Sequence, residues 1–238
     1  MNESFDSNFK LRYARQLAIP EIGLEGQKKL INSKVLIIGC GALGSMVAMQ
    51  LAAAGIGSLG LIDYDNIDIS NLQRQFFFNS LEIGCSKVEI LDKKISALNP
   101  EIKTKVFSGI MNKKMAETLF PFYDFIVDAT DNPDSKKITG DFAKLSVKPC
   151  CIAGVKDFQG QVMTFLPNDD RFEEFFGVAN ADGFLPCSLG GVLGPAAALA
   201  ASIQASETIK YLIDTGTLLN GRLLVFNLLS NYFRVLSL

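Results

Sequence analysis

The sequence predicts an α/β fold: a mostly parallel sheet flanked by helices, with antiparallel strands added at the C-terminal end. Two observations lead to it. Apolar runs alternate with segments of helical period from residue 33 to residue 155, the pattern of a parallel sheet covered on both faces. Beyond residue 155 the chain becomes richer in strands. The length of 238 residues, without internal repeats, fits a single domain over 1–238.

The first half of the chain supplies the alternation. Residues 33–39 (SKVLIIG) predict a buried strand that ends at a glycine turn, and residues 42–55 follow with helical spacing and stop at a glycine. Residues 58–65 predict a second strand, which runs into acidic residues. Residues 85–100 are amphipathic and end at Asn-Pro, which is typical of a helix end. Residues 102–109 alternate as a strand does.

The middle of the chain continues the pattern. A short helix is expected at 112–120, an apolar strand ending in acids at 123–132, and a helix that begins with proline at 133–146. Strands follow at 148–155 and 160–167.

The C-terminal part differs in character. Residues 168–189 have no clear period and many turn residues, which indicates a long loop. Residues 194–213 form a long helix that is apolar nearly all round at its start, and we therefore expect it to be buried. Residues 221–238 have the pattern of a hairpin with "LLSN" at its turn.

The composition excludes several classes of function. Apolar residues make up 48% of the chain, enough for a sizeable core, and the net charge of −2 leaves no basic excess for nucleic acid. The chain has no histidine, which excludes Ser-His-Asp triads and histidine-ligated metals. The first ten residues lack the apolar core of a signal peptide, and no stretch is long enough to span a bilayer. We expect a cytoplasmic protein that binds neither nucleic acid nor membrane.

Five cysteines are present, without a C-x-x-C pair. An odd number without that spacing argues against a disulfide framework and against a structural zinc site. Free thiols behave by default as small buried hydrophobes. We assign that packing role to four of the five: Cys40, Cys85, Cys150 and Cys151.

The strongest local signal is the glycine turn Gly39-x-Gly41-x-x-Gly44 between the first strand and its helix. In a Rossmann-like unit the first glycine allows the tight turn, the second lets the backbone approach a phosphate, and the third packs helix against strand. The helix N-terminus then offers N–H groups and a positive dipole end to an anion. The plain alternative is a strand–turn–helix unit that binds nothing.

Asp63 ends the second strand, where an acid meets the two hydroxyls of a ribose. Such a contact serves NAD and the adenosine of ATP equally. The turn and Asp63 together therefore predict adenosine rather than NAD in particular, against the alternative of a solvated acid at a strand end.

Cationic side chains follow. In "NLQRQ" (71–75), Asn71 and Arg74 are three residues apart and share one face of a helical turn, from which Arg74 could clamp a phosphate. Lys87 lies in the first turn of its helix, where a cation opposes the helix dipole unless an anion is close. Taken singly, Arg74 and Lys87 are each explained more simply as ordinary surface residues.

The segment "DATDN" (128–132) places two acids at the carboxyl end of an apolar strand. Open α/β sheets bind ligands at that edge, and a carboxylate there suits Mg²⁺ held through phosphates and water. Asp131 is the acid we assign to Mg²⁺. As an alternative, Asp131 caps the next helix.

Taken together and in order, these segments resemble the ThiF/MoeB/HesA family, the prokaryotic branch of the ubiquitin-activating enzymes. The resemblance covers roughly residues 10–236 and includes "RYARQ" and "QASETIK". The glycine turn alone is unspecific, but the ordered set is highly specific. It comprises the turn 39–44, "DYD" (63–65), "NLQRQ" (71–75), Lys87 and "DATDN" (128–132).

The resemblance implies an ATP- and Mg²⁺-dependent adenylyltransferase. Its substrate would be the C-terminal carboxylate of a small ubiquitin-like sulfur-carrier protein, of the ThiS or MoaD kind, ending in Gly-Gly. It also implies three parts of the domain: a helical arm at about 8–32, a nucleotide-binding core at about 33–155 and a carrier-binding part at about 156–238. Thiamine or molybdopterin biosynthesis is the usual setting.

By the same resemblance, Asp63 would hold the ribose and Asp131 the Mg²⁺. The phosphates would be contacted by Asn71, Arg74 and Lys87. Arg15, in "RYARQ", matches the arginine that reaches across a homodimer to the ATP of the other subunit. An ordinary surface arginine is the alternative for Arg15.

Two further points concern cysteines. Many family members carry two C-x-x-C pairs that bind zinc, and this chain lacks both, so zinc is not expected. Cys187, in "PCSLGGVLGP", matches the cysteine that some members use to attack the acyl-adenylate; its alternative is an unreactive loop thiol. A helix N-terminus near Gly194 would favour its thiolate.

Two other functions stay open at this point. The glycine turn and Asp63 also permit an NAD-dependent oxidoreductase of Rossmann type, but that activity leaves "NLQRQ", Lys87 and "DATDN" without a role. A non-catalytic subunit of an activating enzyme is the second, and such subunits usually lose the arginine or the acid that this chain keeps.

Overall fold

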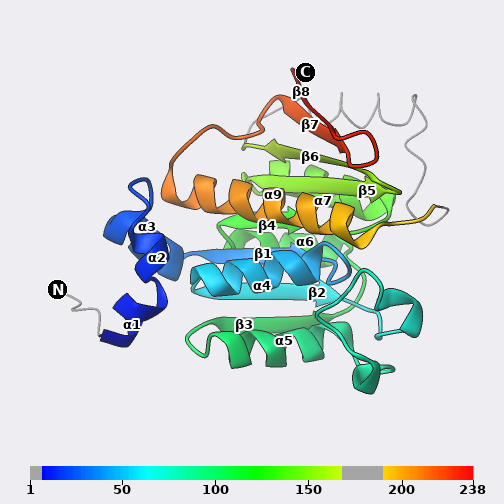
Figure 1. The fold of residues 1–238 in the computed structure, drawn as a ribbon, viewed down its shortest axis with the longest axis horizontal. Coiled ribbons are helices and arrows are strands. Elements are labelled where there is room, and N and C mark those ends of the chain that lie inside the picture. Colours follow the sequence, from blue (N-terminus) through cyan, green and yellow to red (C-terminus); the bar gives the residue numbers. More distant parts are fainter. Residues whose placement is uncertain (1–6, 168–189, 238) are drawn as a thin grey trace.

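The computed structural model describes residues 7–167 and 190–237. Within these ranges one sheet of eight strands runs in the order β3-β2-β1-β4-β5-β6-β7-β8 (Figure 1). The first five strands in the chain are mutually parallel: β1 Lys34–Ile38, β2 Ser58–Asp63, β3 Lys103–Ser108, β4 Phe125–Asp128 and β5 Cys150–Lys156. The antiparallel extension consists of β6 Gln159–Phe165, β7 Arg222–Asn227 and β8 Tyr232–Ser237. The predicted fold class is confirmed.

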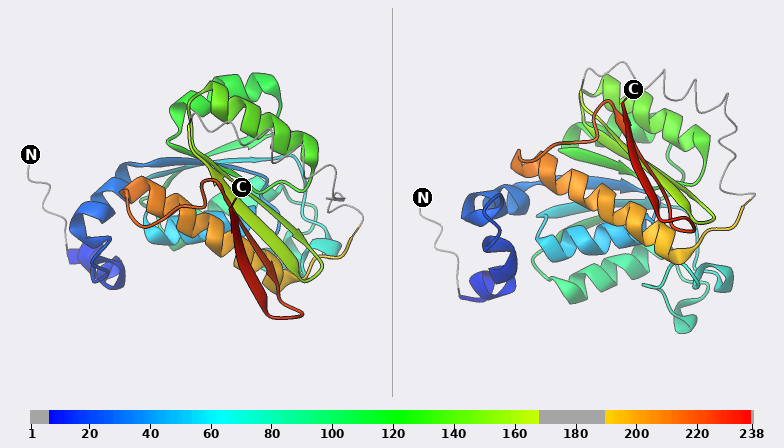
Figure 2. Two further views of the ribbon diagram at one scale, coloured as in Figure 1. Left: turned by 90° about the horizontal axis from the view of Figure 1, so that it is seen from above. Right: turned by 45° about the horizontal axis from the view of Figure 1, so that its top comes forward.

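Helices cover both faces of the parallel strands (Figures 1 and 2). On one face lie α4 Gly44–Ala54, α5 Lys87–Leu98 and α9 Gly194–Ile213, and on the other lie α6 Lys113–Leu119 and α7 Pro133–Leu145. Three short helices form an N-terminal arm: α1 Ser7–Arg12, α2 Ala14–Leu17 and α3 Gly23–Asn32. Single 3-10 turns occur at η1 Ile69–Asn71, η2 Ser80–Glu82 and η3 Phe120–Phe122.

Strand β1 explains why the first apolar run is continuous rather than alternating. Val35 and Ile37 belong to the core cluster that includes residues of α4 and α5, whereas Leu36 and Ile38 belong to the second cluster, on the α6–α7 side. All four side chains are almost fully buried. A fully buried Val, Leu or Ile contributes roughly 1.5–3 kcal/mol relative to an exposed one. The two half-cores therefore fix the central strand from both sides.

The N-terminal arm lies at the end of the sheet where the parallel strands begin (Figure 1). Tyr13 is buried, and its hydroxyl accepts a hydrogen bond from Nδ2 of Asn99 at 2.8 Å. Asn99 is the residue that directly follows α5. Gly55, which ends α4 at φ 87°, lies so close to Tyr13 that a Cβ would come within 2.7 Å of the ring. Since α4 and α5 run back from the carboxyl edge of the sheet, the arm lies at its amino edge.

Most expected elements agree with the structure to within two or three residues, and the hairpin turns at Leu228–Asn231 as predicted. Two details were wrong. The strand expected at 123–132 ends at Asp128, because the chain then turns through Ala129–Asp131. The helix expected at 85–100 begins at Lys87, which leaves Cys85 in the preceding turn, exposed instead of packed. The loop predicted at 168–189 lies outside the described residues.

In the part of the chain that the structure describes, the helices are all too short or too polar to cross a membrane.

Candidate active site

A cavity of about 480 Å³ opens at the carboxyl edge of the sheet. The strand order reverses between β1 and β4, since β2 and β3 lie to one side and β5 to the other. Crevices at such a reversal are where open α/β sheets bind ligands. The turn after β1 and the turn after β4 both line this cavity, and so do residues that follow β2 and β3.

The glycine turn lines the cavity. Gly39 has φ 83°, a conformation that favours glycine, and its N–H donates to the carbonyl of Ile62 at 2.8 Å. Gly44 begins α4, and a Cβ on it would lie 1.7 Å from the carbonyl oxygen of Gly39. The close approach of helix and strand therefore requires glycine at position 44. Gly41 and Leu43, which lead into α4, line the cavity, so the positive dipole end of that helix is directed toward it.

Asp63, the last residue of β2, is held in a fixed orientation. Its Oδ2 accepts a hydrogen bond from the N–H of Cys40 at 2.6 Å, and its Oδ1 accepts one from the N–H of Asp65 at 2.8 Å. A carboxylate has about four acceptor positions, so these two bonds leave capacity for a ligand's hydroxyl groups. The contact with Cys40 joins the acid directly to the glycine turn.

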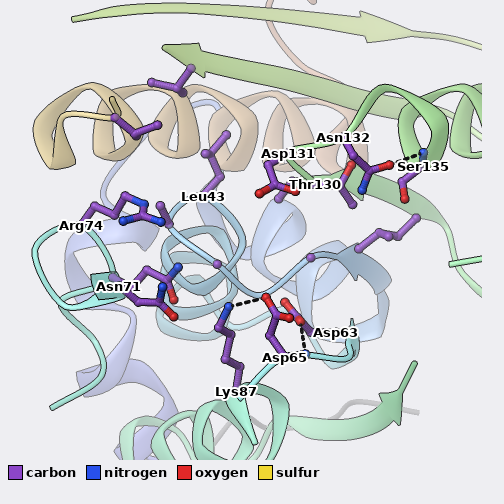
Figure 3. A pocket seen from close by; sticks show the side chains of 18 of the residues that line it. Leu43, Asp63, Asp65, Asn71, Arg74, Lys87, Thr130, Asp131, Asn132 and Ser135 are labelled. Carbon is purple, nitrogen blue, oxygen red and sulfur yellow. Dashed lines mark hydrogen bonds and ion pairs between the residues drawn. The ribbon is translucent and has the colours of Figure 1, made fainter. Parts of the chain in front are cut away.

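Three side chains that can bind phosphate lie along one side of the cavity (Figure 3). Lys87 is the first residue of α5, and its Nζ forms an ion pair with Asp65 Oδ2 at 2.8 Å. The guanidinium of Arg74 donates through Nη1 to the carbonyl of Ser70 at 2.9 Å. Asn71 ends the 3-10 turn η1, and its carbonyl accepts a hydrogen bond from the N–H of Arg74 at 3.1 Å in the turn that follows.

The opposite wall carries the acids of the β4 turn. In Figure 3, Thr130 and Asp131 lie across the cavity from Arg74 and Lys87. Asp131 is exposed, and among the described residues no hydrogen bond or ion pair engages its carboxylate. The cap of α7 is Asn132, whose Oδ1 accepts from the N–H of Ser135 at 2.7 Å. The alternative in which Asp131 caps that helix is therefore wrong.

The cavity also has an apolar part to its lining, to which Ile62, Ile110 and Met111 contribute. A flat heterocyclic base suits such a lining. Sequence inspection missed Ile110 and Met111. Their position directly after a parallel strand was the available signal.

Tyr64 lies at the mouth of the cavity, 60% exposed. Repulsion of its phenolate by Asp65, followed by partial burial and the charges of Asp131 and Asp63, raises the pKa of the Tyr64 hydroxyl. Tyr64 is therefore neutral at physiological pH. The same interactions show that all three carboxylates act on one region of the cavity.

Among the described cysteines, three are buried and Cys85 is exposed. Cys40, Cys150 and Cys151 are buried, as expected, and burial raises the pKa of the Cys40 thiol well above its ordinary value, assisted by the charge of Asp63. Cys40 is therefore a packing residue of the turn and not a nucleophile. Cys187 lies outside the described residues.

Arg15 is not brought to the cavity of its own chain. It lies exposed on α2, in the arm at the amino edge of the sheet, whereas the cavity opens at the carboxyl edge (Figure 1).

The order of these features along the chain agrees with a known family. A model of the ThiF family matches residues 13–238. The chain belongs to the ThiF family. MoeZ of Mycobacterium tuberculosis, described as a probable adenylyltransferase/sulfurtransferase, is 36% identical over 233 residues, and the match covers 95% of this chain but 59% of MoeZ. This ThiF-family chain thus spans little more than half of MoeZ.

Two further comparisons place the chain within the family. The sulfur carrier protein adenylyltransferase of Thermus thermophilus is 33% identical over 233 residues, which cover 95% of this chain and 86% of that protein. The crystal structure of PaaA superposes with a TM-score of 0.83 at 25% identity, covering 100% of this chain and 76% of PaaA. The ThiF fold therefore extends over the whole described chain.

Proposed function

We propose that this chain is an ATP-dependent adenylyltransferase that activates the C-terminal carboxylate of a small ubiquitin-like sulfur-carrier protein ending in Gly-Gly. One arrangement carries the proposal: in a single cavity, a fixed carboxylate suited to a ribose lies beside cations suited to phosphates and opposite an unpaired acid. Two relatives named as adenylyltransferases support the same reaction, and the name of one of them, from Thermus thermophilus, specifies a sulfur carrier protein.

The residues available suit this chemistry. The attacking carboxylate oxygen of the carrier is already ionised, so no general base is needed, and a site without histidine can serve. That oxygen forms a bond to the α-phosphorus of ATP while the bond to the oxygen bridging the α- and β-phosphates breaks. Acyl-adenylate and pyrophosphate result. The charge that develops on the phosphates calls for fixed cations, the role we give to Arg74 and Lys87, with Asn71 as a neutral donor.

The donor set fits Mg²⁺ bound mainly through substrate. The described residues contain no group of three or more His, Cys, Asp or Glu that could hold a metal, while Asp131 offers one unpaired carboxylate. Mg²⁺ typically takes one or two carboxylates and completes its shell with phosphates and water. When bound, it would neutralise phosphate charge. We assign the protein ligand to Asp131 and expect no zinc.

The position of Arg15 supports a homodimer. Because the arm lies at the amino edge of the sheet, Arg15 would reach an ATP only in the cavity of a second copy. Each active site would then be shared between two subunits, and two-fold symmetry would give the dimer two equivalent sites of this kind.

The C-terminal sheet supports the assignment of the carrier-binding part to 156–238. Strand β8 is the edge strand, and Tyr232, Phe233 and Val235 are 45%, 56% and 48% exposed. Exposed apolar groups on a free edge are typical of a surface that binds another protein. Acyl transfer to Cys187, which would form a thioester and release AMP, is a second step that we include in the proposal.

Cys40, Cys85 and Cys151 are free thiols, which is typical of a reducing compartment, and we place the reaction in the cytoplasm. Its usual settings would be molybdopterin or thiamine biosynthesis.

Exchange of labelled pyrophosphate into ATP tests the function. Exchange that requires Mg²⁺ and a carrier with an intact Gly-Gly end is the expected result, and a carrier truncated by its last glycine is the control. Thermal stabilisation by ATP–Mg²⁺ should exceed that by NADH. The proposal is contradicted if no carrier encoded near the gene supports pyrophosphate exchange, or if NADH stabilises the protein more than ATP–Mg²⁺ does.

A further inference from the structure

Strands β4 and β5 diverge at the cavity. Their parallel pairing ends at Asp128 and Ile152. Beyond this pair, β4 turns away through Ala129 and Thr130 to Asp131, while β5 continues to Lys156 paired with β6. Both branches line the cavity, the first through residues 129–132 and the second through residues 153–155. The width of the cavity at this point therefore depends on how the two branches are held.

Asp128 fixes the first branch. Its side chain is 0% exposed, and its Oδ1 accepts hydrogen bonds from the N–H and the hydroxyl of Thr130, at 3.0 Å and 2.7 Å. These bonds form a tight turn one residue before Asp131. In the described structure the other oxygen, Oδ2, is buried without a hydrogen-bond partner. The charge of Asp128 thus depends on the groups that meet Oδ1.

Lys136, in the second turn of α7, joins the two branches. Its Nζ lies 3.1 Å from Asp128 Oδ1 and donates to the carbonyl oxygen of Ala153 on β5 at 2.8 Å. The Lys136 side chain is 13% exposed, so both bonds form in a poorly hydrated environment where they are strong. Among the described residues, Lys136 is the cation paired with Asp128.

Gln204 of α9 binds the same two strands from the opposite face of the sheet. Its Nε2 donates to the backbone carbonyls of Asp128 at 2.9 Å and Cys151 at 3.2 Å. Gln204 binds paired residues of both strands, whereas Lys136 joins Asp128, the last paired residue of β4, to Ala153, the first residue of β5 beyond the pairing. The divergence is therefore fixed on one side by a neutral amide and on the other by a charge.

We propose that Lys136 is a positioning residue for adenylation: through Asp128 and Ala153 it fixes the Asp131 turn relative to the β5 wall of the cavity. The inference rests on the proposed function, because Asp131 is the proposed Mg²⁺ ligand. Asp63, Arg74 and Lys87 approach the cavity from other elements, so nucleotide affinity does not depend on Lys136. Lys136 acts on kcat and on the Mg²⁺ requirement.

The test uses the full chain with Lys136→Met, Lys136→Arg and Lys136→Gln. Lys137→Met is the matched control, because Lys137 is the neighbouring lysine of α7 and pairs on the surface with Asp141. Pyrophosphate exchange should show a kcat about 100-fold lower in Lys136→Met, since a misplacement of about 1 Å costs that much. The KM for ATP should change less than about threefold, and more Mg²⁺ should be needed for half-maximal rate. Lys136→Arg should restore most of the rate.

Hydrogen exchange of the Thr130 amide provides a readout independent of any carrier, since that amide donates to Asp128. We expect it to exchange about tenfold faster in Lys136→Met than in the wild type and in Lys137→Met. A folded Lys136→Met with wild-type kcat and unchanged Thr130 exchange overturns the inference, and so does a loss carried entirely by the KM for ATP. If Lys136→Met does not fold, the same criteria apply to Lys136→Gln.

Failure of the wild-type protein to catalyse exchange with any carrier overturns the proposed function. Faster Thr130 exchange in Lys136→Met would then still support the structural part of the inference, that Lys136 fixes the Asp131 turn, and unchanged Thr130 exchange would overturn that part too.

Discussion

The Nζ of Lys87 lies 2.8 Å from Oδ2 of Asp65, at the point in the cavity where we place a phosphate. The lysine side chain is 5% exposed, whereas Asp65 is 44% exposed. A nearly buried ammonium requires an anionic partner. Asp65 provides it in the free protein, and a phosphate of ATP would either share or replace that contact.

Asp65→Asn should therefore destabilise the free protein more than the ATP-bound protein. Loss of this partly exposed pair costs about 1 kcal/mol, which lowers Tm by roughly 2–4 °C in a chain of this size. Saturating ATP–Mg²⁺ should recover the loss, so the rise in Tm on adding ATP should be larger in Asp65→Asn than in the wild type. Differential scanning fluorimetry measures both. Lys94 lies on the same helix as Lys87 and pairs with Glu82 of η2. Glu82→Gln is therefore the control, and its ATP shift should equal that of the wild type. An equal shift in all three proteins contradicts the phosphate assignment of Lys87.

Asp131→Asn should lower the rate of pyrophosphate exchange about 10²- to 10³-fold, because it removes the charged oxygen assigned to Mg²⁺. The variant should fold normally, since Asp131 is exposed and outside the helix cap. Titration of Mg²⁺ at fixed ATP measures the effect, and a higher half-maximal concentration is expected. Asp134→Asn, in the first turn of the same helix, should leave the rate near that of the wild type. A wild-type Mg²⁺ curve in Asp131→Asn would remove this residue from the site.

Phe233→Glu should raise the KM for the carrier at least tenfold and leave the KM for ATP unchanged. A charge placed on the exposed apolar edge of β8 opposes burial of that surface by a partner protein. Leu81→Glu is the control, because Leu81 is 96% exposed and lies in η2, away from the C-terminal strands. Steady-state exchange with varied carrier gives both constants. If both variants bind the carrier as the wild type does, the carrier binds elsewhere.

Reaction with iodoacetamide at pH 8 should separate the cysteines. Burial raises the pKa of the Cys40 thiol well above its ordinary value, so Cys40 remains protonated below that pKa, and it is also shielded from solvent. Cys85 is exposed and should be alkylated first among the described cysteines. Mass spectrometry of peptic fragments locates the label, with Cys85→Ser as the control. Early labelling of Cys40 would show that the glycine turn opens in solution.

The glycine turn and the strands around it were predictable from sequence because local rules decide them. Gly39 needs its positive φ and Gly44 its missing Cβ, and the apolar strand β1 needs burial on both faces. That Asp63 and Asp131 lie in one cavity was predictable because strand ends at one edge of a parallel sheet converge. These features depend only on residues close in the sequence and on the direction in which the strands run.

What sequence inspection missed depends on contacts between distant segments. Lys136 looks like one of two adjacent helix lysines, and only the register of β4 against β5 shows that it bridges Asp128 and Ala153 while Lys137 faces solvent. Cys85 was misplaced for a smaller reason. The helix begins two residues later than its amphipathic pattern indicates, because Ser86 is extended and pairs with Asn66 in an isolated bridge.

Arg15→Ala should nearly abolish exchange if each site is shared, and complementation can prove the sharing. A heterodimer of Arg15→Ala with Lys87→Met contains one cavity with both Lys87 and the partner's arginine, and one cavity with neither. Purified through two different tags, it should show about half of the wild-type rate per dimer, whereas each variant homodimer is inactive. Lys10→Ala, an exposed cation of the same arm, should be active on its own. An inactive heterodimer would mean that Arg15 and Lys87 serve the same chain, which the opposite positions of the arm and the cavity argue against.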